Sequence, residues 1–334
     1  MQYKVLGNTG VKVSQLCFGT MSFGGDADEE TSHAMFKRCL DAGINFFDCA
    51  NVYQTGLAEE ILGRCMQGIR RDLVITSKFR FPMGDGPNQS GASRKHILQS
   101  IEDTLERLDT DYLDLYFIHR FDESTPLEET LRALDDLVRA GMILYPAVSN
   151  FAAWQIAKAL GISALHDWAR FACIQPMYNL LKRQAEVEIL PLAQSEQLGV
   201  ISYSPLAGGY LSGKYSSAHW PDQGRLVSNK MYSTRYGADW MMQAVDAFLA
   251  KAQDLGVHPA SLAVAWVGAH PAITAPIIGA RNLDQLEDSL NAVNVEMTPE
   301  LYARLSDLTP DPGVATDRSE EKSSFNYNAI LTKK

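Results

Sequence analysis

Three apolar runs in the first 120 residues decide the fold: INFFD at residues 44–48, LVITSK at 73–78 and LDLYFIH at 113–119. Each run is short and apolar on both faces, which is typical of a strand in a parallel sheet. Each run also ends on an ionisable residue, namely Asp48, Lys78 or His119. A lysine is unusual there because an isolated ammonium is costly to bury. We therefore expect these strand ends, together with Tyr53 just beyond the first, to form an active site.

The same alternation of apolar runs and amphipathic stretches continues along the chain. One stretch places Leu127, Leu131, Leu134 and Val138 on a single helical face and ends at Gly141. Eight strands are predicted, at residues 15–18, 44–48, 73–78, 113–119, 143–149, 172–175, 200–203 and 273–278. Eight buried parallel strands, each followed by a helical stretch, predict an α/β fold of the closed (β/α)8 TIM barrel type rather than an open sheet.

The two ends of the chain lie outside this repeat. The turn Asn8-Thr9-Gly10 predicts an N-terminal β-hairpin over residues 1–14, and the polar residues 310–334 predict an extended C-terminal tail. No linker rich in proline, serine or glycine divides the chain, so we expect one domain over residues 1–334.

Two long loops and one proline interrupt the regular pattern. Residues 80–92 and 204–239 are expected on the face where the carboxyl ends of the strands meet, because barrel active sites form there. Pro146 falls within the predicted strand 143–149 and has no N–H to donate, so we expect a bulge or a shortened strand at that point.

Composition excludes several classes of function. A net charge of −10 argues against nucleic acid as a partner, and no apolar run has the length of a signal peptide core or a membrane span. Five scattered cysteines without CxxC spacing indicate reduced thiols in the cytoplasm. The histidines form no HxH pair, which disfavours a metal-dependent barrel hydrolase, so we expect no metal.

The four polar residues at the strand ends have complementary chemistry. The ammonium of Lys78 is expected to lower the pKa of Tyr53 and so improve it as a proton donor. Asp48 supplies a counter-ion for Lys78, and His119 orients a carbonyl oxygen by hydrogen bonding. This set polarises a C=O group and protonates the developing alkoxide, but no side chain supplies hydride, so a cofactor is required.

Several segments together resemble the aldo-keto reductase superfamily along nearly the whole chain. Residues 43–53, followed by Ala58-Glu59, are similar to the signature of that superfamily, and Lys78 and His119 lie in matching strands. The resemblance implies an NAD(P)H-dependent carbonyl reductase with Asp48, Tyr53, Lys78 and His119 as catalytic residues. It also implies that NADPH binds in an extended form, without a Rossmann domain.

The resemblance further implies which residues contact the cofactor. Ser149, Asn150 and Gln175 would hold the nicotinamide carboxamide, and Tyr203 would stack on the ring. Arg281 is assigned to the 2′-phosphate because a planar guanidinium suits it, although departures at Ala280 and Ser289 leave acceptance of NADH open. The remaining implied contacts are Gly19, Thr20, Met21, Asp48, Ser204, Pro205, Leu206, Gly208, Leu211, Lys214, Arg225, Gly279, Gln285 and Asp288.

The substrate is expected to be a small carbonyl compound that contacts Tyr53, His119, Phe23, Phe79 and Arg120. A sugar, an aromatic aldehyde and a secondary-metabolite or xenobiotic ketone all stay open. An alternative is a nucleotide-sensing binding subunit that resembles the channel-associated members of the superfamily. The presence of His119 disfavours that alternative, since the resemblance implies that those members replace it. We expect a monomer or a weak homo-oligomer.

Overall fold

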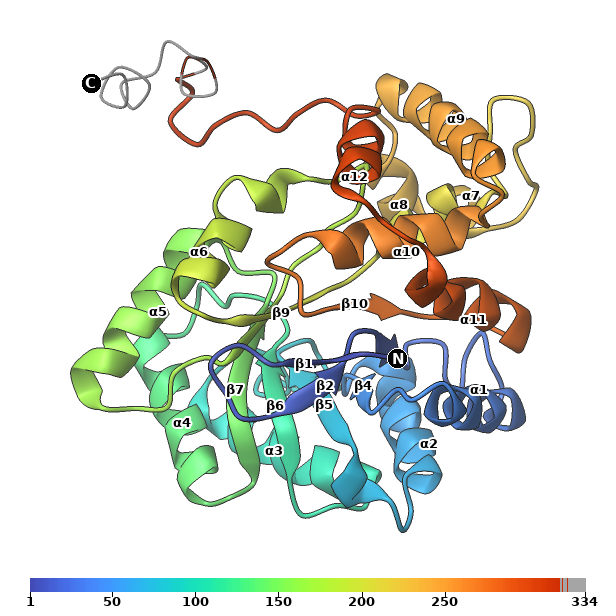
Figure 1. Cartoon of the computed structure of the whole chain (residues 1–334). Helices are drawn as coiled ribbons and strands as arrows, with labels where there is room; N and C mark the ends of the chain where they lie inside the picture. The colour runs from blue at the N-terminus through green and yellow to red at the C-terminus, as the bar shows by residue number, and fades with distance from the viewer. Residues whose placement is uncertain (319, 321–322, 324–334) are drawn as a thin grey trace.

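Eight parallel strands close into a barrel in the computed structural model, which describes residues 1–318, 320 and 323 (Figure 1). The strands pair in the order β10–β3–β4–β5–β6–β7–β8–β9. Their bounds are β3 Cys17–Gly19, β4 Phe46–Asp48, β5 Val74–Phe79, β6 Leu113–Ile118, β7 Ile143–Ser149, β8 Cys173–Gln175, β9 Gly199–Ser202 and β10 Ala275–Ile278. The predicted (β/α)8 barrel is therefore confirmed.

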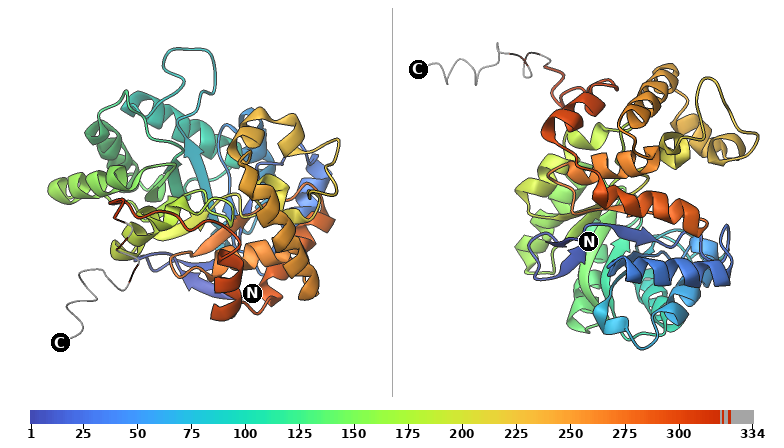
Figure 2. Two further views of the ribbon diagram at one scale, coloured as in Figure 1. Left: turned by 90° about the horizontal axis from the view of Figure 1, so that it is seen from above. Right: turned by 45° about the vertical axis from the view of Figure 1, so that its right-hand side comes forward.

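Helices surround the barrel and cover its outer face (Figures 1 and 2). The helix α3 illustrates why they form, because the side chain of Ser93 caps its first turn and Ile97, Ile101 and Leu108 are buried along one face. The helices are α1 Glu29–Asp41, α2 Leu57–Cys65, α3 Arg94–Leu108, α4 Leu127–Arg139, α5 Ala153–His166, α6 Ile189–Ser195, α7 Arg225–Ser228, α8 Lys230–Arg235, α9 Asp239–Asp254, α10 Pro259–Ala269, α11 Leu283–Leu290 and α12 Pro299–Ser306.

The core has two parts because successive side chains of a strand point to opposite faces. On β5, Ile75 and Phe79 belong to the large cluster between the barrel and the helices, whereas Val74 belongs to a smaller cluster inside the barrel. Lys78 follows Val74 in the same alternation and therefore points into the barrel at the other end of the strand.

An antiparallel hairpin closes the end of the barrel where the strands begin. Its strands are β1 (Tyr3–Val5) and β2 (Lys12–Ser14), so the predicted hairpin is confirmed. Leu6 and Val13 join the inner apolar cluster. Gly7 has a φ of +54°, and a Cβ there would lie 2.5 Å from the backbone nitrogen of Gly199, the first residue of β9. The hairpin thus rests directly against the strand starts.

The expected disruption at Pro146 is wrong. Strand β7 is continuous over seven residues, and Pro146 pairs in register with Tyr116 of β6. On its other side the carbonyl of Pro146 accepts from the N–H of Ala172, just before β8 begins at Cys173. Proline lacks a backbone N–H. At this position the missing donor falls at the end of the β7–β8 ladder, where β8 has not yet begun, so its loss does not break the strand.

The long segment after β9 is partly folded. Residues 204–239 contain the short helices α7 and α8 and the 3-10 helix η4 (Ala207–Ser212), and Figure 2 shows α7 and α8 beside α9. Residues 310–318 contain no helix or strand and lead away from α12, and most of the predicted tail lies outside the described residues.

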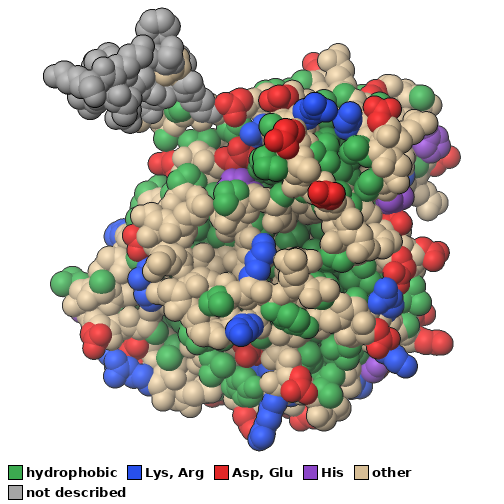
Figure 3. All heavy atoms as spheres, in the orientation of Figure 1, with side chains coloured by type: hydrophobic (Ala, Val, Ile, Leu, Met, Phe, Trp, Pro, Cys, Tyr) green, Lys and Arg blue, Asp and Glu red, His purple; other side chains and the backbone are tan. Residues whose placement is uncertain are grey.

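Charged side chains of both signs are scattered over the face shown in Figure 3. The net charge of −10 is therefore not gathered into one patch on that face. In the described part of the chain, no helix combines the length and the apolar character needed to cross a bilayer.

Candidate active site

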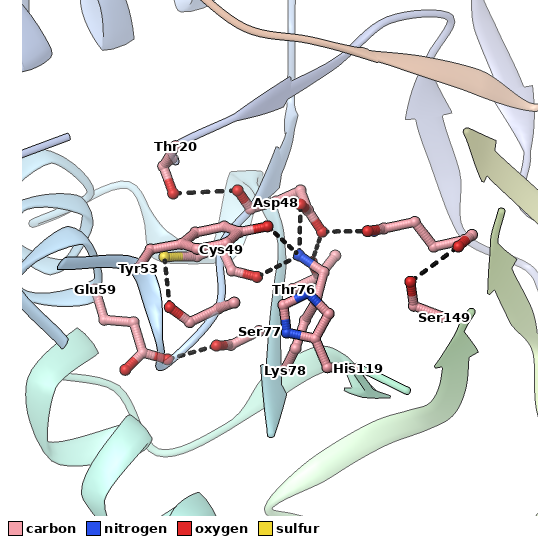
Figure 4. Close-up of polar contacts among 12 residues, drawn as sticks. Thr20, Asp48, Cys49, Tyr53, Glu59, Thr76, Ser77, Lys78, His119 and Ser149 are labelled. Carbon is pink, nitrogen blue, oxygen red and sulfur yellow. Dashed lines mark hydrogen bonds and ion pairs between the residues drawn. The ribbon is translucent and has the colours of Figure 1, made fainter. Parts of the chain in front are cut away.

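The carboxyl ends of three neighbouring strands bring the predicted catalytic residues together (Figure 4). Asp48 ends β4, Lys78 is the penultimate residue of β5, and His119 directly follows β6. Tyr53 begins the 3-10 helix η1 (Tyr53–Gly56), which follows β4. Parallel pairing places all these strand ends at one end of the barrel, so residues 71 positions apart in sequence meet there, from Asp48 to His119.

A buried ion pair lies at the centre of the site. The ammonium of Lys78 donates to the carboxylate of Asp48 at 2.6 Å and to the carbonyl of Cys49 at 2.7 Å. Both side chains are almost fully buried, at 0% and 3% exposure. The other oxygen of Asp48 accepts from Thr76 at 2.7 Å and from Gln175 at 2.9 Å. These hydrogen bonds compensate for moving the two charges out of water.

Lys78 stays charged in this setting. Burial by itself lowers the pKa of the lysine, but the neighbouring Asp48 carboxylate and the Tyr53 hydroxyl favour the ammonium, and the net result is a raised pKa. The fixed ammonium lies 3.4 Å from the hydroxyl oxygen of Tyr53. A permanent positive charge therefore faces the hydroxyl group of Tyr53.

The expected lowering of the tyrosine pKa is wrong for this structure. Burial raises the pKa of Tyr53 to about 12. Lys78 lowers it, but not enough to overcome burial, and Asp48 raises it further. The low polarity around the ring disfavours the phenolate more than one ammonium favours it, because that ammonium is already neutralised by Asp48. Tyr53 accordingly carries its proton at neutral pH, as a general acid must.

His119 lies beside Tyr53 and is neutral. The two rings meet edge to face with centroids 6.1 Å apart. Burial, followed by the positive charges of Lys78 and Arg80, lowers the pKa of His119 well below its usual value. A neutral imidazole retains one N–H to donate to an oxygen atom in the site.

The turn that carries Tyr53 is held from outside the barrel. Gln54, Thr55 and Gly56 all have positive φ angles, of 49°, 55° and 98°. A Cβ at Gly56 would lie 2.7 Å from the side chain of Arg107, whose guanidinium donates to buried Glu59 at 2.7 Å. These contacts support a strained turn next to the site.

Sequence reasoning missed two supporting residues. Thr76 bonds Asp48, and its position two residues before Lys78 on β5 already placed it on the same strand face. Glu59 was noted only as part of a family segment. In the structure it is fully buried and accepts from Ser77, the neighbour of Lys78 on the outer face. Glu59 is buried because α2 packs against α3, and no pattern in the neighbouring sequence predicts that packing.

Amide and hydroxyl groups from three further strands form a connected set next to the ion pair. Asn150 donates to the hydroxyl of Ser149 and to the carbonyl of His119, both at 3.0 Å, and accepts from Tyr203 at 2.7 Å. Ser149 donates to the carbonyl of Gln175 at 2.9 Å. The structure thus gathers the four residues assigned to the nicotinamide.

Cations gather at a second place near the end of the barrel. Arg281 pairs with Asp26 at 2.9 Å, and Arg225 approaches the same carboxylate at 4.0 Å. Burial, then Arg281 and Arg225, lower the pKa of Lys214, which places the three cations close together. One carboxylate does not neutralise three cations, so this cluster fits the phosphates of an NADPH molecule.

The other predicted cofactor residues lie around these two groups. The hydroxyl of Thr20 donates to the backbone oxygen of Asp48 at 3.1 Å, and Met21 is 40% exposed. The side chain of Gln285 accepts from the backbone of Arg281 at 3.3 Å, whereas Asp288 faces His258, which caps the start of α10. Leu211 is buried beneath the segment that carries Ser204, Pro205, Leu206 and Gly208, while Gly19 and Gly279 end or follow β3 and β10.

Two residues predicted to contact the substrate lie in the core. Phe79 is fully buried and packs on Tyr116 outside the barrel, with centroids 4.8 Å apart. Phe23 is also fully buried and packs against Phe18 at 5.8 Å. The alternation that points Lys78 inward points Phe79 outward. Arg120, by contrast, is exposed beside His119. In residues 1–318, 320 and 323, no cluster of His, Cys, Asp or Glu is arranged to hold a metal ion.

Comparison with known proteins supports an oxidoreductase. Residues 15–309 match the model of the Aldo/keto reductase family. The chain is 39% identical over 330 residues to an uncharacterized oxidoreductase, YrpG, of Bacillus subtilis, which covers 95% of this chain and 98% of the relative. It is 33% identical over 307 residues to L-glyceraldehyde 3-phosphate reductase of Escherichia coli O157:H7, and the alignment covers 88% of each chain.

A different kind of relative appears in plants. The chain is 40% identical over 313 residues to a probable voltage-gated potassium channel subunit beta of Oryza sativa subsp. japonica, covering 91% of this chain and 95% of the relative. All these matches span nearly the whole barrel, including the ends of the strands that carry the polar site. The resemblance seen in the sequence is thus confirmed, and the chain belongs to the aldo/keto reductase family as an NAD(P)H-dependent oxidoreductase.

Proposed function

We propose that this protein reduces an aldehyde or ketone to an alcohol, with NADPH as hydride donor and Tyr53 as general acid. The proposal rests mainly on one distance. The hydroxyl of Tyr53 lies 3.4 Å from the ammonium of Lys78, which Asp48 holds in place. That geometry offers a proton and a compensating charge at one point. It provides no nucleophile for a hydrolytic reaction.

A nicotinamide cofactor, when bound, would supply the hydride that no side chain can provide. Ser149, Asn150 and Gln175 would orient its carboxamide through their side-chain amide and hydroxyl groups, and Tyr203 would cover the ring. Hydrogen bonds among Ser149, Asn150 and Tyr203, and one from Gln175 to Asp48, hold these side chains in position, so little reorganisation is needed when the cofactor binds. Lys214, Arg225 and Arg281 would hold the phosphates.

Tyr53 donates its proton to the carbonyl oxygen as that oxygen gains negative charge. The ammonium of Lys78 stabilises the phenolate that remains, and water then returns a proton to Tyr53. A raised pKa keeps the tyrosine protonated before the reaction. The N–H of neutral His119 points the carbonyl oxygen toward the phenol and stabilises its developing charge.

Replacement of Tyr53 by phenylalanine tests this assignment. We expect Tyr53→Phe to lower kcat for aldehyde reduction by about 10²–10⁴-fold, the usual contribution of a positioned acid. The dissociation constant for NADPH should change by less than about twofold, because Tyr53 makes none of the proposed phosphate or carboxamide contacts. Tyr3→Phe, an exposed change on β1, serves as the control. A variant that keeps wild-type turnover would show that another group donates the proton.

A second candidate function is a cofactor-sensing subunit of a membrane channel. It is favoured by the 40% identity to the rice channel subunit. A panel of aromatic aldehydes, sugars, dicarbonyls and fused-ring ketones separates the two candidates. Measurable oxidation of NADPH with any member supports the reductase. Tight NADPH binding without turnover on the whole panel supports the channel subunit.

We also propose that the protein acts in the cytoplasm, as a monomer or a weak homo-oligomer. All five cysteines are free thiols, and four of them are buried. Free thiols are the usual state in a reducing compartment.

A further inference from the structure

Arg80 has an unusual backbone conformation next to the active site. It follows β5 directly, two residues after Lys78, and its φ angle is +110°. A residue with a long side chain rarely adopts such an angle, and strained residues of this kind gather at functional sites. The carbonyl of Arg80 accepts from the N–H of Gly91, which closes the base of the loop 80–91. This hydrogen bond fixes the start of the side chain in place.

The guanidinium of Arg80 lies close to the proposed catalytic histidine. Its Cζ is 5.7 Å from the centroid of the Phe81 ring, and the Phe81 ring lies 4.7 Å from the imidazole of His119 at an angle of 67°. After burial and Lys78, the charge of Arg80 is a further cause of the lowered pKa of His119. The Phe81 ring thus contacts both the Arg80 guanidinium and the His119 imidazole.

Apart from the ring of Phe81, Arg80 has no partner for its charge among the described residues. In the described part of the chain its guanidinium makes no hydrogen bond or ion pair, although the side chain is partly buried and Nε is enclosed without an acceptor. The acidic residue across the loop, Asp122, is occupied by the backbone of Ala92 at 2.7 Å and by the hydroxyls of Ser124 and Thr125.

The arginine at the opposite end of the same strand shows the contrast. Arg70 precedes β5, and its Nη atoms donate to Asp114 at 2.8 Å and to the carbonyls of Leu73 and Tyr112. Arg70 also stacks on Tyr112 at 4.1 Å. The Nη atoms of Arg70 therefore have acceptors, although its Nε, like that of Arg80, has none. The difference lies in the outer part of the guanidinium, which has no acceptor in Arg80 at the end of the barrel where the substrate would enter.

We propose that Arg80 binds an anionic group of the substrate, a carboxylate or a phosphate, and so makes the enzyme selective for carbonyl compounds that carry one. The inference rests on the proposed carbonyl reductase function and names the class of substrate. A free guanidinium presents a fork of N–H donors that matches either anion. Phe81 provides an apolar surface for the part of the substrate between the anion and the carbonyl group.

A matched pair of aldehydes tests this selectivity. 4-Carboxybenzaldehyde carries a carboxylate, and 4-formylbenzamide is a neutral molecule of nearly the same shape. In Arg80→Met we expect the ratio of their kcat/KM values, charged over neutral, to fall by about 10- to 100-fold, the usual effect of losing a hydrogen bond to a charged group. Arg80→Lys should retain part of the ratio. Arg71→Met removes an exposed charge before β5, at the far end of the barrel, and should leave the ratio unchanged.

Binding measurements separate a failure of this inference from a failure of the proposed function. Benzoate and benzamide, titrated by calorimetry into the protein with NADP⁺, report the anion site without turnover. Preference for benzoate in the wild type, lost in Arg80→Met, supports the site even if no aldehyde is reduced. Equal binding of the two, or a ratio of kcat/KM that Arg80→Met leaves unchanged, overturns it.

A second pair of substrates and a replacement variant complete the experiment. Glyceraldehyde 3-phosphate compared with glyceraldehyde shows whether phosphate is selected in the same way as carboxylate, since only the former carries the anion. If Arg80→Met fails to fold by circular dichroism, Arg80→Gly replaces it, because glycine adopts a φ of +110° without strain. The same loss of charge selectivity is expected in that variant.

Discussion

The two ends of the barrel differ in what the inward-facing side chains do. Where the strands begin, the inner positions are apolar and the hairpin covers them with Leu6 and Val13. Where the strands end, the same alternating positions carry polar groups. Along β5 this change runs from Val74 through Thr76 to Lys78. The corresponding changes elsewhere are Phe46 to Asp48, Phe117 to His119, Ala147 to Ser149, Cys173 to Gln175 and Ile201 to Tyr203.

This difference separates stability from chemistry within single strands. The inner positions of the closed end bury apolar surface, which favours folding. The open end buries the charges of Asp48 and Lys78 and accepts a strained turn after Tyr53, both of which oppose folding. Residues two or four positions apart thus serve opposite purposes, and mutations at the two ends should have distinguishable effects.

The largest effect is expected at the open end, in Lys78→Met. It leaves the buried Asp48 carboxylate without its partner, so unfolding free energy should fall by about 3–5 kcal/mol, and kcat should fall by about 10²–10⁴-fold as Tyr53 loses the facing charge. Urea denaturation and steady-state NADPH oxidation measure the two effects. Adding Asp48→Asn should restore much of the stability without restoring kcat. Recovery of both would mean that the pair is structural only.

A smaller effect, on stability alone, is expected at the closed end. Leu6→Ala removes a fully buried side chain between the hairpin and the strand starts and should lower the unfolding free energy by about 2–4 kcal/mol. The kcat/KM of the folded enzyme should stay within about twofold. Val5→Ala, at a 51% exposed neighbour, is the control for urea denaturation. A marked loss of kcat/KM in Leu6→Ala would show that the two ends are coupled.

A change in the cation cluster should alter the choice between NADPH and NADH rather than stability. Arg281→Ala is expected to raise the dissociation constant of NADPH about tenfold, because a charge-assisted contact to the 2′-phosphate is lost. NADH, which lacks that phosphate, should be affected by less than about twofold. Fluorescence titration measures both constants, with Arg139→Ala on α4 as control. Equal losses for the two cofactors would remove the assignment.

The smallest effect is a dependence of stability on pH. Because the pKa of His119 is lowered in the folded protein, the unfolded chain binds more protons below pH 6.5. Stability from this residue is therefore greatest well above pH 6.5 and declines as the pH falls from 6.5 to 5.5. His96 and His270 are shifted in the same direction, so the measurement is the difference between wild type and His119→Gln in urea denaturation at both pH values. If the unfolding free energy changes equally with pH in both proteins, the pKa of His119 is not lowered in the folded state.

Much of the site could be predicted from local patterns. The inward direction of Asp48, Lys78 and His119 follows from their positions at the ends of apolar runs, and the parallel arrangement brings those ends together. The same alternation would have excluded Phe79, which the prediction nevertheless included. Phe23 gave no such signal, because its burial against Phe18 depends on how the chain turns after β3.

The order of apolar and polar residues along the strands determined, by itself, a barrel with a polar site at one end, since periodicity and chain order are local properties. Only the tertiary structure decided the pKa of Tyr53, the support from Glu59 and the lack, among the described residues, of an acceptor for the Arg80 guanidinium. Burial and pairing depend on segments far apart in the chain, such as α2 against α3 and the loop 80–91 against Asp122. Their electrostatic effects arise only once those segments have packed.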